Sequence, residues 1–146
     1  LLAEACRERG LPYDAARCVM SSSPINEAGY AAGKYLLRRV SRMPTALMAS
    51  SDMIALGLLQ VLSERGLDVP RDVAVASIDD IPIASMVRPA LTTVRQPIVA
   101  MARLALDRLM GPEAHLNERV LVPGDLVIRD STGAARSAVP PGSGAA

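Results

Sequence analysis

The chain has 146 residues, enough for one domain with a buried core, and half of them are hydrophobic. That core must be aliphatic because the chain has no Phe or Trp and only three Tyr, which also leaves few rings to stack on bases or sugars. A formal net charge of +1 lacks the basic excess of a nucleic-acid-binding domain, so this segment alone is not expected to bind DNA.

Segments with helical periodicity alternate along the chain with short extended runs, and Gly or Pro separates them. The expected helices are residues 1–9 ended by Gly10, 25–40, 52–65 ended by Gly66, one turn at 82–87, and a helix opened by Pro97 that runs to Met110. The expected strands are residues 17–21, 45–50, 73–78, 91–95, 119–122 and 125–129. We expect strands 45–50 and 73–78 to be buried. This alternation predicts an α/β fold with a parallel sheet flanked by helices.

The two ends of the chain carry their own expectations. Residues 1–9 have the pattern of the last turns of a helix already under way, which predicts a further segment upstream. From Gly133 on, the chain has too little apolar content to pack, so residues 133–146 are expected to be a disordered tail.

Acidic and hydroxyl side chains follow two predicted strands. Ser51 and Asp52 follow strand 45–50, and either can cap the next helix, with Asp52 the favoured cap. Asp79 and Asp80 directly follow strand 73–78. Open α/β sheets bind ligands at the carboxyl ends of their strands, and a carboxylate can accept hydrogen bonds from two ligand hydroxyls. The alternative for Asp79 is a solvated turn, and for Asp80 we expect a cap of the next turn or a support for its neighbour.

Nothing in the sequence points to catalysis or to a bound cofactor or metal. The single histidine, His115, lies in a polar loop without a nucleophile nearby, and no phosphate-binding or metal-spaced motif is present. Cys6 and Cys18 are expected to be packing residues, and their small number favours a reducing cytoplasm. Since no apolar run reaches about 18 residues, we expect a soluble protein with no membrane partner, and with the cysteine count the expected location is cytoplasmic.

Three phrases of the sequence resemble the LacI/GalR family of transcription regulators. They are PTALMASSDMIALG at 44–57, VPRDVAVASIDDIPIASMVRPALTTVRQP at 69–97, and LVIRDST at 126–132. The resemblance implies a two-lobed fold of the periplasmic-binding-protein-like type I, with most of the C-terminal lobe in residues 1–132. Residues 91–96 would cross into the incomplete N-terminal lobe, and 98–110 would be a helix of that lobe. The family's helix-turn-helix has no counterpart in this segment.

The same resemblance assigns an effector site. It implies that Asp79 contacts the effector, that Ser51 stands where an asparagine usually reaches it, and that Gln96 faces the cleft between the lobes. Gln96 can instead be an exposed crossover residue. Pro24 falls where many members carry an aromatic side chain, and proline offers only a small apolar face to a sugar or purine.

The resemblance also implies a homodimer. Leu56, Leu59 and Met86 correspond to the family's dimer surface, although Leu56 and Leu59 can equally serve their own core. The predicted function is the ligand-sensing and dimerisation portion of a repressor, controlled by a sugar-like or nucleoside-like effector and acting on operator DNA through a domain outside this segment. The alternatives are a sugar-binding protein of an ABC transporter, and a folding or dimerisation unit that binds nothing well.

Overall fold

The computed structural model describes residues 2–21, 23–40, 42–111 and 119–133. Its sheet has four strands in the order β1-β2-β3-β4, which are Ala46–Met48, Ala74–Asp79, Thr92–Arg95 and Asp125–Val127. The first three strands run parallel to one another, and β4 is antiparallel to β3. The expected α/β architecture with a parallel sheet is therefore confirmed, and only the strand that returns to the sheet after the crossover runs the other way.

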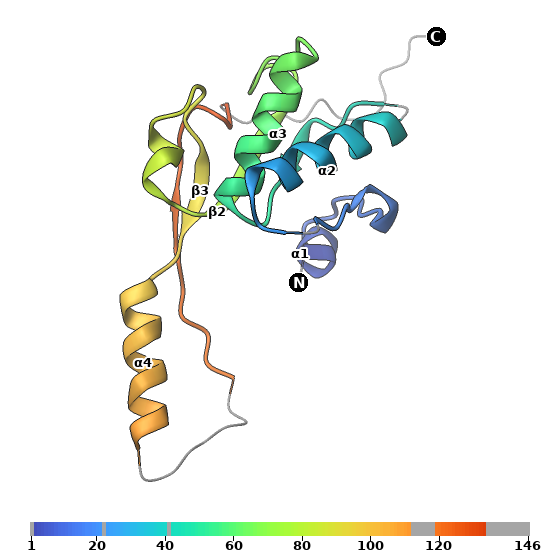
Figure 1. The fold of residues 1–146 in the computed structure, drawn as a ribbon. Helices are drawn as coiled ribbons and strands as arrows, with labels where there is room; N and C mark the ends of the chain where they lie inside the picture. The colour runs from blue at the N-terminus through green and yellow to red at the C-terminus, as the bar shows by residue number, and fades with distance from the viewer. Residues whose placement is uncertain (1, 22, 41, 112–118, 134–146) are drawn as a thin grey trace.

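The helices follow the predicted order. They are α1 (Leu2–Glu8), α2 (Asn26–Arg39), α3 (Asp52–Glu64) and α4 (Ile98–Met110), with short 3-10 helices η1 (Ala15–Arg17) and η2 (Pro82–Ser85). Figure 1 shows α2 lying across α3 beside the sheet, whereas α4 stands apart from the other helices and the sheet. In the described part of the chain, no helix is long and apolar enough to cross a membrane.

The core is aliphatic, as the composition predicts, and lies between α3 and the sheet. Its buried residues come from the end of β1, from α3, from the segment around β2, from η2 and from the start of β3, and they are Ala49, Ala55, Leu58, Leu62, Val73, Val75, Ala84 and Leu91. This packing holds α3 against the sheet.

Two glycines allow α2 and α3 to cross closely. A Cβ on Gly57 would overlap the backbone oxygen of Asn26, and a Cβ on Gly29 would overlap that of Ile54. Neither backbone atom can move away as the end of a flexible side chain can. Helix packing therefore explains why Gly57, the last residue of the phrase at 44–57, is a glycine.

Two predicted strands are wrong. In the run 17–21, Arg17 belongs to η1 and Met20 is 92% exposed, and no described strand pairs with this run. Residues 119–122 also stay outside the sheet, because the pairing of β3 with β4 ends at Arg95 opposite Asp125 and leaves earlier residues without a strand opposite. Extended backbone without a partner does not become a strand.

The prediction of two buried strands is half right. β2 is central and buries alternate side chains, but β1 is the outer strand of the described sheet, and its Ala46 and Met48 are exposed. A strand at the edge lacks the cover that a central strand receives. The apolar run at 45–50 therefore predicted a strand correctly, but the prediction that this strand is buried is wrong.

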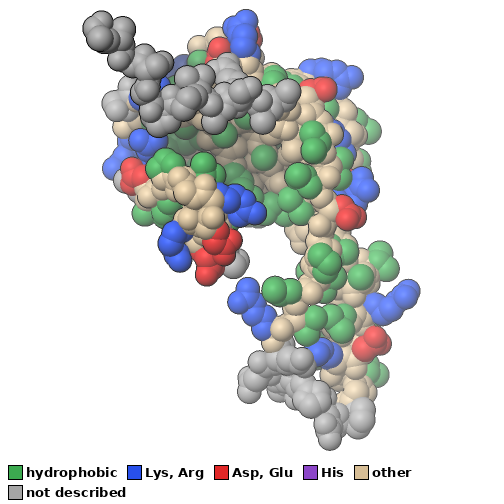
Figure 2. All heavy atoms as spheres, turned by 180° about the vertical axis from the view of Figure 1, so that it is seen from behind, with side chains coloured by type: hydrophobic (Ala, Val, Ile, Leu, Met, Phe, Trp, Pro, Cys, Tyr) green, Lys and Arg blue, Asp and Glu red, His purple; other side chains and the backbone are tan. Residues whose placement is uncertain are grey.

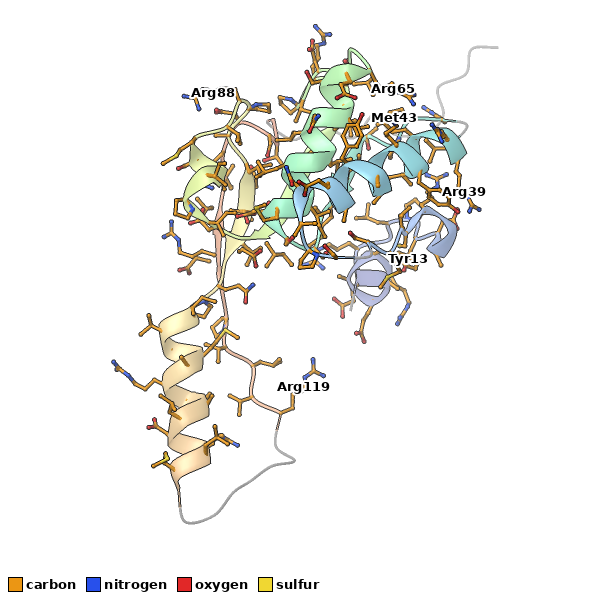
Figure 3. The ribbon with its side chains drawn as sticks, in the orientation of Figure 1. Tyr13, Arg39, Met43, Arg65, Arg88 and Arg119 are labelled. Carbon is orange, nitrogen blue, oxygen red and sulfur yellow. The ribbon has the colours of Figure 1, made fainter. Side chains whose placement is uncertain are left out.

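Helix α4 is present as predicted, and it has no buried residue. Its largest exposed apolar side chains include Val99, Leu109 and Met110, which are 73%, 70% and 84% exposed. Figure 2 shows hydrophobic side chains gathered over this projecting part of the molecule. Figure 3 shows Arg119, on the returning segment, well apart from the side chains of the lobe. His115 and the tail from 134 onward lie outside the described residues.

Candidate functional site

The sheet register brings three predicted site residues to one edge. Met48, the last residue of β1, is opposite Ala76, so Ser51 after β1 and Asp79 at the end of β2 are each three residues further on from this pair. Asp79 is in turn opposite Arg95, the neighbour of Gln96. Adjacent strands lie about 4.8 Å apart. Ser51, Asp79 and Gln96 therefore share the carboxyl edge of the sheet, on the side where β3 leads into α4.

Asp79 and Gln96 are already in contact. The Gln96 Nε2 group donates a 2.6 Å hydrogen bond to Asp79 Oδ1, and both side chains are half-buried. A carboxylate has about four acceptor positions, and an amide has a second proton and an oxygen. The pair can therefore accept hydrogen bonds from a ligand and donate one as well.

The backbone turns sharply at this point. Asp79 has φ 127° and Asp80 has φ 60°, and they are the positive-φ residues other than glycine in the described ranges. Such conformations cost about 1–3 kcal/mol each and persist only when the surroundings hold them. The turn sends two neighbouring carboxylates in different directions, Asp79 toward Gln96 and Asp80 toward two arginines.

Asp80 is a buried clamp rather than a cap. Its carboxylate accepts from Arg95 Nε at 2.7 Å and from Arg129 Nη2 at 2.6 Å, and its side chain is 6% exposed. Burial raises the pKa of Asp80, but the hydrogen bonds and charges of Arg129 and Arg95 outweigh it and hold this pKa below its usual value. Asp80 does not cap η2, because the N-cap residue of η2 is Ile81, which makes no side-chain cap hydrogen bond.

Ser51, not Asp52, caps α3. The Ser51 hydroxyl accepts a hydrogen bond of 3.3 Å from the amide of Ile54 and keeps its own proton for another acceptor. Asp52 is the first helical residue and is fully buried. The prediction that favoured Asp52 as the cap is wrong, because its side chain turns inward to the sheet.

The buried Asp52 is the residue that the sequence analysis missed as part of this site. Its Oδ1 accepts from the hydroxyls of Ser77 at 2.5 Å and Thr93 at 2.7 Å, and its Oδ2 accepts from the amide of Ile81 at 2.8 Å. A signal was available in the sequence. Ser77 and Thr93 are hydroxyl residues inside two apolar strands, and buried hydroxyls need partners.

Comparison with known proteins identifies the family. The periplasmic binding protein-like domain family matches residues 1–132. Over 113 residues the chain is 42% identical to the HTH-type transcriptional regulator MalR of Streptomyces coelicolor, covering 75% of this chain and 32% of that protein. The chain belongs to the LacI/GalR family of transcriptional regulators.

Solved structures of LacI family regulators have the same fold. One from Mycobacterium smegmatis superposes with a TM-score of 0.76 at 32% identity, covering 89% of this chain and 49% of that one. Another, from Lactobacillus casei with bound sucrose, has a TM-score of 0.70 at 27% identity, covering 90% and 49%. The chain thus spans about a third of the curated regulator and about half of each structure. These relatives are regulators rather than enzymes.

In this LacI/GalR chain, residues of the closing phrase LVIRDST form hydrogen bonds with the start of the crossover at 91–96 and with β2. The buried Ser131 hydroxyl donates to the carbonyl of Val75 at 2.6 Å and accepts from the amide of Thr92 at 2.8 Å. Arg129 Nη1 donates to the carbonyl of Leu91 at 2.8 Å. Arg129 therefore joins the start of β3 to Asp80 at the end of β2.

Pro24 is exposed and lies two residues before the start of α2. The first turn of α2 packs on the first turn of α3, so Pro24 belongs to the same end of the lobe as Ser51. A hollow of about 550 Å³ lies elsewhere and includes none of the predicted effector residues. It is lined by Cys18, Val19, Met20, Ser21, Ala28, Ala31, Ala32, Tyr35 and Arg39.

The predicted dimer residues differ in burial. Leu56 and Leu59 are half-buried and pack against the core, which is the alternative that the sequence left open. Met86 is 70% exposed, and Ile83 on η2 is 43% exposed. A dimer of two copies of this chain, formed through these residues, stays a prediction.

Proposed function

We propose that this chain is the effector-sensing portion of a LacI/GalR repressor, with Asp79, Gln96 and Ser51 forming its contact with a small neutral ligand. The observation that carries this proposal is the 2.6 Å hydrogen bond between Gln96 and Asp79 at the carboxyl edge of the sheet. Ligand sites of open α/β sheets form at this edge. Pro24 contributes a small apolar surface at the same end of the lobe.

The chemistry of these groups favours a ligand rich in hydroxyls. Asp79 and the Gln96 oxygen are acceptors, and hydroxyls are good donors to a carboxylate. Arg95 Nε and Arg129 Nη2 both donate to Asp80, so the Asp80 carboxylate offsets part of their positive charge, which disfavours an anionic ligand. A neutral sugar or nucleoside fits this set, and the bound sucrose of the Lactobacillus casei relative is of this class.

In the complete protein, the effector would act by changing the relation between the two lobes. β3 and β4 form the link between the described lobe and α4, so a ligand held at the end of β3 lies at this link. Operator binding belongs to a helix-turn-helix domain outside residues 1–146. We further propose a cytoplasmic homodimer that uses Leu56, Leu59 and Met86, with 1–132 as the sensing unit. A sugar-binding protein of a transporter is disfavoured by the family assignment.

A thermal-shift screen tests the effector site. The 146-residue chain is screened with neutral sugars, polyols and nucleosides beside Asp79→Asn, in which the shape is kept and the charge is lost. A ligand at a hundred times its Kd adds about 2.7 kcal/mol to stability. We expect at least one compound to raise the Tm of the wild type and of a control, Asp72→Asn, but not that of Asp79→Asn. In the control the lost carboxylate accepts the Asp68 amide at 2.8 Å, away from the site.

Two results would contradict the proposal. One is a folded wild-type chain whose Tm responds to no compound in the panel. The other is a compound that stabilises Asp79→Asn as much as the wild type.

A further inference from the structure

A single buried carboxylate, that of Asp52, lies behind all three proposed ligand-contacting residues. Asp52 is fully buried at the start of α3 and follows Ser51 in the chain. A buried charge is tolerated only when hydrogen bonds satisfy it, and Asp52 accepts three. None of these three bonds is needed to cap α3, since the Ser51 hydroxyl does that.

Two of the three donors lie on either side of the turn that carries Asp79. Ser77 lies two residues before Asp79, and Ile81 lies two residues after it, and both donate to the Asp52 carboxylate, at 2.5 and 2.8 Å. Asp79 and Asp80 have positive φ between these two anchor points. The carboxylate of Asp52 therefore bonds to the chain on both sides of the turn that orients Asp79.

The third donor belongs to the neighbouring strand. Thr93 is opposite Ser77 in the sheet register, and its hydroxyl donates to the same Asp52 oxygen at 2.7 Å. Three residues further along, β3 leads to Gln96, the partner of Asp79. Asp52 therefore joins the strand ends that carry Asp79 and Gln96.

We propose that Asp52 is the positioning residue of the effector site, holding the Asp79 turn and the end of β3 so that Asp79 and Gln96 meet. This inference rests on the proposed function, in which Asp79 and Gln96 contact the effector. Asp52 does this from inside the protein and does not contact the ligand. Asparagine can replace it in part, because its oxygen can accept from the Ile81 amide while its NH₂ group donates to the two hydroxyls.

The test needs no ligand, so it stands apart from the effector screen. ¹⁵N spectra of the 146-residue chain report the side-chain amide of Gln96 and the exchange rate of the Ile81 backbone amide. The chain has two glutamines, and Gln60 serves as the internal reference because its amide bonds to Glu64 at 3.1 Å on α3. Asp79→Ala defines the signal of a released Gln96, and Asp72→Asn is the control carboxylate variant.

In Asp52→Ala we expect the Gln96 signal to move to its position in Asp79→Ala, and Ile81 exchange to rise about tenfold or more. Asp52→Asn should restore most of both wild-type values, and Gln60 should not move in any variant. A folded Asp52→Ala with wild-type Gln96 and Ile81 signals would overturn the proposal.

Where Asp52→Ala does not fold, the double variant Ser77→Ala/Thr93→Val decides. It removes both hydroxyl donors and leaves the Ile81 bond to the carboxylate. We expect the same displacement of Gln96 and a rise of about threefold in Ile81 exchange. Unchanged signals in this variant overturn the proposal. A wild-type chain that binds no sugar contradicts the proposed function alone.

Discussion

Asp79 and Asp80 are adjacent in the chain, but they have different tasks at the scale of single residues. Asp79 points to Gln96 and remains half-buried, whereas Asp80 is closed in by two guanidinium groups. Their positive φ angles aim them apart. One residue can therefore bind a ligand while its neighbour holds the strands together.

The Asp80 clamp predicts a specific dependence of stability on pH. The pKa of Asp80 lies below that of an unfolded aspartate, which is about 3.9. A carboxyl whose pKa is lowered by folding stabilises the protein fully above the unfolded pKa, and this contribution is lost as the pH falls through the folded pKa. Asp80→Asn should lower the free energy of unfolding by about 3 kcal/mol at pH 7.

The measurement is urea unfolding of both chains from pH 7 to pH 3. The gap between wild type and Asp80→Asn should be constant down to about pH 4 and then narrow. The control is Asp107→Asn, at an exposed residue of α4. A gap that keeps its size at pH 3 would show that the ionised Asp80 is not the source of the stability.

Sequence reasoning found where the acidic residues lie but not their partners. The ends of the strands were predictable from periodicity, so Asp79 and Ser51 could be placed at one edge. Asp80 pairs with Arg129, 49 residues away, and Asp52 bonds to Ser77 and Thr93 on other elements. Such partners depend on the tertiary fold, and local propensity therefore favoured helix caps for both carboxylates.

At the scale of elements, the crossing of α2 over α3 sets the position of the helix that begins at the site. Gly57→Ala would place a methyl group into the backbone of α2. We expect a loss of about 3 kcal/mol in the free energy of unfolding, as for severe overpacking. Gly10→Ala is the control, because Gly10 has open space around it and a φ of 64°, so strain alone should reduce stability by about 1 kcal/mol. Equal losses in the two variants would mean that the crossing is not tight.

Helices were easier to predict than strands for a physical reason. A helix makes its hydrogen bonds within one segment, so α2, α3 and α4 appear within one or two residues of their predicted bounds. A strand depends on a neighbour. Residues 17–21 and 119–122 have extended patterns but no pairing among the described strands.

At the scale of the whole molecule, the exposed apolar side chains include those along α4 and around η2. If η2 is part of a dimer surface, Met86→Lys should bury a charge there and weaken association by tenfold or more, since an unpaired buried charge costs several kcal/mol. Sedimentation equilibrium measures this. Met20→Lys is the control at a methionine that is 92% exposed on another segment. A monomeric wild-type chain, or equal weakening by both variants, contradicts the proposed dimer.

The most direct test of the effector site is to add each neutral sugar and nucleoside to the ¹⁵N-labelled chain and follow individual amides. Binding at the carboxyl edge of the sheet should shift the side-chain amide of Gln96 and the backbone amides of Asp79 and Asp80, and leave Gln60 in place. A compound that binds but moves only residues around the hollow beside α2, such as Tyr35, would contradict the assignment of the site, and so would a folded chain in which no compound moves Gln96.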